Sequence, residues 1–207
     1  MNLARSALII VDMQNDFCPD GALPVPEGDK IVPIINKISS KFYKVIATQD
    51  WHPSNHKSFA SVHKKNIYDT IELNGITQIL WPDHCIQGSK GADFHPELNL
   101  NPVDLIIRKG TNPNVDSYSA FQENDKITKT GLEYYLKGLN IKDIYLTGLA
   151  TDYCVFYTAI DGKEAGFNVY VIIDATQGID FPEGDLKNKI EIMKKQGIKI
   201  IKSEELF

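Results

Sequence analysis

Residues 148–155 have the sequence Gly-Leu-Ala-Thr-Asp-Tyr-Cys-Val, and they join a strand pattern to a helix pattern. The apolar run at 143–147 before them is typical of a buried strand, and residues 152–164 after them are predicted to form a helix. Cys154 is therefore predicted to lie where a strand turns into the first turn of a helix. Unpaired N–H groups and the positive end of the helix dipole gather at such a point, and both favour a thiolate and a developing oxyanion.

Apolar runs of strand length recur along the chain and alternate with helical patterns. The predicted strands are 6–11, 44–48, 104–107, 143–147, 168–174 and 198–201, and the predicted helices are 29–42, 128–137, 152–164 and 185–196. The first run is continuously apolar, as in a strand buried on both faces. The alternation predicts a three-layer α/β/α fold, in which helices cover both faces of a six-stranded parallel sheet.

The chain length and composition fit one packed domain over residues 1–207. The chain has 207 residues, of which 43% are hydrophobic, and this is enough to bury one core. The polar, poorly periodic stretch at about 54–102 is predicted to be an insertion that carries part of the functional site, because long irregular insertions in compact domains are usually functional.

Charge and cysteine usage exclude several classes of partner. The net charge is -5 and no basic block is present, so nucleic acid is not expected to bind. No apolar run approaches the length of a membrane span, and the N-terminus has no signal-peptide pattern. Three cysteines at wide spacings do not suggest a disulfide framework, which favours a reducing, cytoplasmic location. The sequence leaves a homo-oligomer open.

Polar side chains follow four of the predicted strands. These residues are Asp12, Asp50 with His52, Lys109 and Cys154. Ligands of open parallel sheets bind beyond the carboxyl ends of the strands. The sequence therefore predicts that these side chains gather at one edge of the sheet.

Cys154 is the candidate nucleophile. A free cysteine most often packs as a small apolar residue, but its place at a helix start favours a reactive thiol. Cys18 and Cys85 lack that position and are interpreted as structural.

Asp12 and Lys109 are candidate partners of this thiol. A carboxylate can accept the thiol proton and later deliver it to a leaving amine, and a nearby lysine would keep the carboxylate ionised. Since cysteine nucleophiles commonly use histidine, His52 and His84 remain alternatives for the base.

Asp50 and His52, spaced i and i+2, form a candidate metal site. A carboxylate with imidazoles suits zinc or another divalent transition metal, and the insertion offers His56 and His84 as further ligands. The alternative is that these histidines are solvated loop residues. Aromatic residues also flank the polar groups and could form the walls of a pocket for a flat ligand. They are Phe17, Trp81, Tyr118, Phe121 and Tyr153.

Six motifs, in order over about residues 6–175, resemble those of the nicotinamidases, also called pyrazinamidases, of the isochorismatase-like cysteine hydrolase superfamily. They are Asp-Met-Gln-Asn-Asp-Phe at 12–17, Asp-Trp-His-Pro at 50–53, Trp-Pro-Asp-His-Cys at 81–85, Arg-Lys-Gly at 108–110, Ser-Tyr-Ser-Ala-Phe at 117–121 and the stretch at 148–155.

The resemblance implies hydrolysis of nicotinamide to nicotinate and ammonia in NAD salvage, and of pyrazinamide to pyrazinoate, through a cysteine thioester. Cys154 would be the nucleophile, Asp12 the general base and then acid, and Lys109 their electrostatic partner. A cis peptide would join Leu149 to Ala150, and the N–H groups of Ala150 and Cys154 would form the oxyanion hole.

The resemblance also implies the metal and substrate contacts. Asp50, His52 and His84 would bind one divalent metal, zinc in first place with iron or manganese as alternatives, while the role of His56 stays open. The nicotinamide ring would lie between Phe17 and Trp81, with Tyr118 and Tyr153 as further contacts.

Two other functions remain as alternatives. Another hydrolase of the same superfamily, such as an isochorismatase or a carbamoyl-amine amidohydrolase, would generally lack the metal ligands. A non-catalytic binding protein of the same fold would not need the three catalytic side chains.

Overall fold

The structure is a computed structural model that describes residues 3–207. Its centre is a six-stranded, all-parallel sheet with the strand order β5-β2-β1-β6-β7-β8. The strands are β1 (Ser6–Val11), β2 (Lys44–Asp50), β5 (Leu105–Lys109), β6 (Asp143–Leu149), β7 (Asn168–Gln177) and β8 (Lys199–Ile201). The predicted sheet is confirmed.

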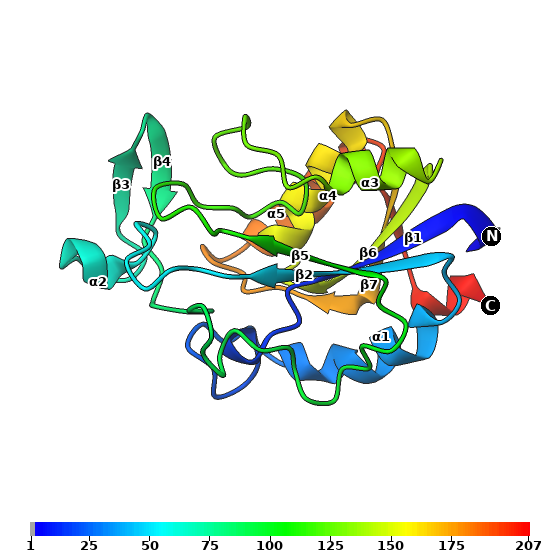
Figure 1. The fold of residues 1–207 in the computed structure, drawn as a ribbon, viewed down its shortest axis with the longest axis horizontal. Helices are drawn as coiled ribbons and strands as arrows, with labels where there is room; N and C mark the ends of the chain where they lie inside the picture. The colour runs from blue at the N-terminus through cyan, green and yellow to red at the C-terminus, as the bar shows by residue number, and fades with distance from the viewer. Residues whose placement is uncertain (1–2) are drawn as a thin grey trace.

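Helices cover both faces of this sheet, as predicted (Figure 1). One face carries α1 (Val32–Ser39), and the other carries α3 (Leu132–Gly138), α4 (Cys154–Glu164) and α5 (Asp185–Lys195). Alternate residues of the fully buried strand β1 face the two layers. Leu8 and Ile10 pack in the cluster that contains α1, whereas Ala7 and Ile9 pack in the cluster that contains α3 and α4.

The helices begin and end close to the predicted residues, with two differences. The helix predicted from residue 128 begins at Leu132, because Lys129 just before it pairs with Gln122 in an antiparallel bridge. The helix predicted over 29–42 divides into the 3-10 helix η3 (Gly28–Ile31) and α1, and Pro33 lies in the first turn of α1. Proline has no N–H to donate and favours the start of an α-helix over its interior. The remaining short helices are η1 (Leu3–Arg5), η2 (Asn15–Phe17) and η4 (Ser203–Leu206). Among residues 3–207, no helix has the length and apolar character that crossing a membrane requires.

The insertion between β2 and β5 is more ordered than its poor periodicity suggests. It contains the short helix α2 (Ala60–His63) and a hairpin of β3 (Thr70–Leu73) and β4 (Ile76–Ile79), which project at one end of the molecule (Figure 1). Asn74 and Gly75 form its two-residue turn, both with positive φ (53° and 78°). An Asn-Gly pair is the sequence typical of such hairpins, so this element could have been predicted.

A close approach of two backbones explains the glycine near the end of β6. Gly148 pairs with Val11 at the end of β1 and has a φ of 101°. A Cβ atom at Gly148 would lie 2.0 Å from the Val11 carbonyl oxygen. The turn after β6 can therefore pass directly beside the end of β1, and the Leu149–Ala150 peptide there is cis, as the resemblance implies.

Candidate active site

The four predicted side chains meet beyond the carboxyl ends of neighbouring strands. Asp12 follows β1, Asp50 ends β2, Lys109 ends β5, and Cys154 begins α4 directly after the turn that follows β6. All four residues are buried. The sheet register brings two of them opposite one another, since Asp50 pairs with Lys109. The predicted gathering at one edge of the sheet is confirmed.

Lys109 is the centre of this cluster. Its Nζ lies 2.9 Å from Asp12 Oδ2 and 2.6 Å from Asp50 Oδ1, and it donates to the Ser117 carbonyl at 2.9 Å. The same nitrogen lies 3.6 Å from Cys154 Sγ. Burial lowers the pKa of Lys109, but Asp12 and Asp50 outweigh this effect and hold the pKa well above its ordinary value. The side chain is therefore a permanent cation beside the thiol.

Asp12 lies close to the Cys154 thiol. Oxygens of Asp12 and Asp50 and the sulfur of Cys154 all lie within 4.8 Å of one another, and Thr48 donates its hydroxyl to Asp12 Oδ1 at 2.6 Å. Burial raises the pKa of the Asp12 carboxyl, and Lys109 only partly opposes the rise. Burial likewise raises the pKa of the Cys154 thiol well above its usual value, against the effect of Lys109.

Burial therefore favours the protonated thiol, with a carboxylate beside it. The position at the helix start favours the thiolate, whereas burial opposes it. The physical reason is the burial of the sulfur, because its charged form loses hydration there.

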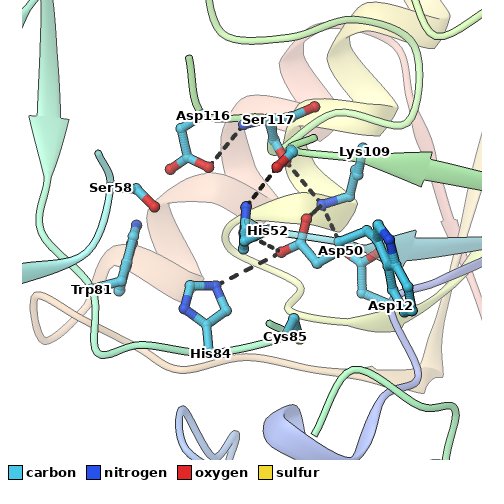
Figure 2. Close-up of polar contacts among 12 residues, drawn as sticks. Asp12, Asp50, His52, Ser58, Trp81, His84, Cys85, Lys109, Asp116 and Ser117 are labelled. Atoms are coloured by element: carbon cyan, nitrogen blue, oxygen red, sulfur yellow. Dashed lines mark hydrogen bonds and ion pairs between the residues drawn. The ribbon is translucent and has the colours of Figure 1, made fainter. Parts of the chain in front are cut away.

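Asp50 lies between Lys109 on one side and two histidines on the other (Figure 2). Its Oδ2 is 3.5 Å from His52 Nε2 and 3.8 Å from His84 Nε2. Within residues 3–207, His52 Nε2 is buried without a hydrogen-bond partner. Two ligand atoms on one tetrahedral zinc ion lie about 3.3 Å apart, given metal–ligand distances of about 2.0–2.1 Å. The three side chains thus have the chemistry and the spacing of a divalent metal site.

Backbone carbonyls orient both histidines of this site. His52 Nδ1 donates to the Gly110 carbonyl at 2.9 Å, and His84 Nδ1 donates to the Pro82 carbonyl at 2.7 Å. Each Nε2 is thereby directed at Asp50, which is the arrangement that metal-bound histidines usually have. Burial, with a smaller contribution from His52, lowers the pKa of His84 to about 4, so its imidazole is neutral and available as a ligand.

His56 lies beside this site, with its ring centroid 4.3 Å from that of His52, but both of its nitrogens have other partners. Its Nε2 lies 3.2 Å from the Val115 carbonyl and must carry the hydrogen. Its Nδ1 accepts from the Ser58 hydroxyl at 2.7 Å and from the Ser58 N–H at 3.2 Å. This geometry makes His56 a neighbour of the metal ligands and gives it no free lone pair for a metal.

A pocket opens at Cys154, and all four predicted substrate-contact residues line it. Those four are Phe17, Trp81, Tyr118 and Tyr153. Trp81 donates its indole N–H to the Tyr118 hydroxyl at 3.0 Å, and its ring meets that of Tyr153 edge to face at 5.0 Å. Asp50 and His84 line the same pocket, so it connects the thiol with the metal site.

The sequence interpretation missed three polar residues of the site. Thr48 positions Asp12, Asp116 lines the pocket, and Gln78 donates to Asp116 Oδ2 at 2.8 Å. Thr48 stands two residues before Asp50 at the end of a predicted strand, which is a usable signal. Nothing in the local sequence links Gln78 of β4 with Asp116, 38 residues later.

The three cysteines form no disulfide with one another. Cys18, Cys85 and Cys154 are free and buried. Cys85 donates its backbone N–H to Asp16 at 2.7 Å, which ties the segment that carries His84 to the loop after β1.

Comparison with known proteins identifies relatives that match nearly the full length of the chain. The model of the isochorismatase domain matches residues 6–205. The curated nicotinamidase of Acinetobacter baylyi is 50% identical over 202 residues, which are 97% of this chain and 94% of that protein. A solved Acinetobacter baumanii nicotinamidase/pyrazinamidase superposes with a TM-score of 0.97 at 48% identity and covers 100% of both chains.

A more distant solved structure bears on the metal. The Pyrococcus horikoshii pyrazinamidase, in complex with zinc, has a TM-score of 0.78 at 41% identity and covers 96% of this chain and 99% of its own. Similarity of this extent, over nearly the full length of each relative, establishes the family. The chain belongs to the isochorismatase-like hydrolases and, among them, to the nicotinamidases.

Proposed function

We propose that this hydrolase converts nicotinamide to nicotinate and ammonia, and pyrazinamide to pyrazinoate, through a thioester on Cys154. The observation that carries the proposal is the shared pocket. It presents a thiol with Asp12 and Lys109 at one end and the donor set of Asp50, His52 and His84 at the other. A flat amide with a ring nitrogen matches both ends at once.

The first half of the reaction forms the thioester. Asp12 accepts the thiol proton while Cys154 Sγ forms a bond to the carboxamide carbon. Asp12 then donates this proton to the amide nitrogen, the C–N bond breaks and ammonia leaves. The raised pKa of Asp12 suits a group that must both accept and donate a proton, and Lys109 moderates the charge that forms on sulfur 3.6 Å away.

The second half releases the acid. A water molecule loses a proton to Asp12 and adds to the thioester carbonyl, the C–S bond breaks, and the proton returns to the Cys154 sulfur. Asp12 therefore carries one proton in each half-reaction. Its anchoring by the Thr48 hydroxyl and the Lys109 ammonium keeps the carboxylate in one orientation throughout.

The N–H groups of Ala150 and Cys154 are the proposed oxyanion hole. Neighbouring N–H groups of the turn are already used: Thr151 donates to the Gln177 carbonyl, and Tyr153 and Val155 donate to the Ala150 carbonyl. None of these bonds involves the two proposed donors. One oxyanion-hole donor contributes roughly 3 kcal/mol to lowering the barrier of acyl transfer.

Asp50, His52 and His84 are the proposed metal ligands, with zinc as the metal. When bound, the ion supplies a Lewis-acid site that holds the ring nitrogen. Phe17 and Trp81, on the walls of the pocket, would contact the ring faces, and Tyr118 and Tyr153 would border it. The buried, unpaired cysteines fit an enzyme of the reducing cytoplasm, where nicotinamide is salvaged for NAD.

The test is ammonia release from nicotinamide by the wild-type chain and by Cys154→Ala. We expect turnover only in the wild type, while calorimetry still detects nicotinate binding to the variant. Cleavage of other amides without cleavage of nicotinamide would overturn the proposed substrate, and unchanged turnover in the variant would overturn the proposed nucleophile.

A further inference from the structure

Asp116 is a buried carboxylate in the substrate pocket to which the proposed reaction gives no role. It is 4% exposed and lines the same pocket as Asp50, His84 and Cys154. A carboxylate oxygen of Asp116 lies within 4.8 Å of ring nitrogens of His52 and His56. The side chain therefore adds a negative charge close to the proposed metal site.

The insertion hairpin fixes the position of this carboxylate. Gln78 of β4 donates its amide to Asp116 Oδ2 at 2.8 Å, and the Ser117 N–H donates to Oδ1 at 2.8 Å (Figure 2 shows the latter bond). Farther along the hairpin, Asn74 donates to the Asn114 carbonyl at 3.0 Å. Each carboxylate oxygen thus has one protein donor and keeps accepting capacity on the pocket side.

The group His52, His56 and Asp116 does not make a second metal site. His52 Nδ1 donates to the Gly110 carbonyl, and His56 has protein partners on both nitrogens. A metal at this position would need lone pairs that these hydrogen bonds already use. Asp116 is therefore not a ligand of a second ion at this position.

We propose that Asp116 is a specificity-determining residue. A metal held by Asp50, His52 and His84 leaves some of its ligand positions open, and Asp116 keeps anions from those positions. Gln78 positions the Asp116 carboxylate. The inference rests on the proposed metal site.

The physical reason lies in the local charge. Asp50 cancels half of the charge of a divalent ion, and Lys109 is already paired with Asp12 and Asp50. An ion with one carboxylate ligand would still attract carboxylates and phosphates, because opposite charges attract more strongly at a buried site than in bulk water. The negative charge of Asp116 cancels the positive charge that the ion retains after Asp50 has bound it. A neutral ring nitrogen is therefore favoured over an anion as the next ligand. The charge of Asp116 also disfavours the nicotinate product in the reversed orientation, with its carboxylate on the metal.

Cobalt(II) makes the inference testable without an activity assay, because its visible absorption reports directly on its ligands. The full chain is loaded with cobalt and titrated with acetate, a small anion, and separately with pyridine, a neutral nitrogen ligand. We expect Asp116→Asn to bind acetate at least about tenfold more tightly than the wild type, whereas pyridine binding changes less than about twofold. Equal acetate affinities in the two proteins would overturn the inference.

Two further variants separate charge from structure. Asn74→Ala removes a hairpin contact that does not touch Asp116, and it should keep wild-type affinities for both ligands. Gln78→Leu keeps the charge but removes its anchor, and it should tighten acetate binding by a smaller factor. If Asp116→Asn does not fold, the acetate titration of Gln78→Leu tests the inference instead. If Gln78→Leu binds acetate no more tightly than Asn74→Ala does, the inference is overturned.

The two proposals fail differently. If pyridine leaves the cobalt spectrum of the wild type unchanged, the proposed contact between ring nitrogen and metal is wrong. If pyridine binds and acetate affinity does not depend on Asp116, only the specificity role is wrong.

Discussion

Lys109 Nζ lies 2.9 Å from Asp12 Oδ2, and both side chains are fully buried. An ion pair without access to water depends on both partners, because the loss of one leaves an uncompensated charge in a medium of low polarity. Lys109 also binds Asp50 at 2.6 Å, so one ammonium serves two carboxylates. The catalytic end of the pocket and the metal end are coupled through this one residue.

Lys109→Met should therefore impair both folding and catalysis. We expect the free energy of unfolding to fall by roughly 3–5 kcal/mol, since two buried carboxylates lose their cation. Urea denaturation at pH 7.5 measures this loss. The double variant Asp12→Asn/Lys109→Met, with one carboxylate fewer, should recover part of it; an equal or larger loss would contradict the ion-pair interpretation.

Asp12→Asn should separate catalysis from folding. The substitution keeps the size of the side chain but removes the proton acceptor, and kcat is expected to fall about 10²–10⁴-fold. Nicotinate affinity, measured by calorimetry, should change little. Thr48→Val is the matched control, because it removes only the hydroxyl that donates to Asp12 Oδ1 and should reduce kcat by a much smaller factor.

Removal of the metal should abolish turnover reversibly. After chelator treatment and dialysis, we expect no ammonia release from nicotinamide, and added zinc should restore it. His84→Ala should lose zinc more readily than the wild type in a competition with a chromophoric chelator, because one of three ligands is absent. Elemental analysis should confirm that the treated protein contains no metal. If such protein is fully active, the ion has no role in the substrate site.

Glu123 should make the stability of the fold depend on pH. Burial, together with the charges of Asp125 and Asp116, raises the pKa of Glu123 to about 7 from an ordinary value of 4.5. Below the ordinary value the carboxyl is protonated in both folded and unfolded chains. Between there and pH 7 only the unfolded chain ionises, so stability falls as the pH rises, by roughly 1–3 kcal/mol in total.

Glu123→Gln removes this titration and should stabilise the protein at pH 8 but not at pH 4.5. Denaturation curves of the two proteins at both pH values test the difference, in which titrations that do not interact with Glu123 cancel. A stability difference that is the same at both pH values would show that Glu123 does not titrate as proposed.

Gly148→Ala should prevent the turn after β6 from forming. A Cβ atom there would meet the Val11 carbonyl oxygen at 2.0 Å, and the φ of 101° is unfavourable for any other residue. We expect a loss of at least about 3 kcal/mol in stability or failure to fold. Gly138→Ala is the control, since no atom lies within 4 Å of its added Cβ and it ends helix α3; its melting temperature should stay level or rise.

Much of the site could be predicted because all strands of a parallel sheet end at the same edge. Continuous apolar runs identify β1, β2, β5 and β6, and the residue that follows or ends each run must lie at the carboxyl edge. Asp12, Asp50, Lys109 and Cys154 are therefore placed together by a local pattern and a general rule of topology. The Asn-Gly turn of the hairpin also had a local signal, although the irregular composition around it obscured the element.

The sequence by itself thus determined the parallel sheet, its helical layers and the edge at which the reactive groups gather, because hydrophobic periodicity is a property of consecutive residues. Only the tertiary structure decided which groups touch. The Gln78–Asp116 bond, the two partners of His56 and the raised pKa of the Cys154 thiol arise from contacts between distant segments and from burial. Such contacts depend on how loops pack against one another, and the local residue pattern does not encode that packing.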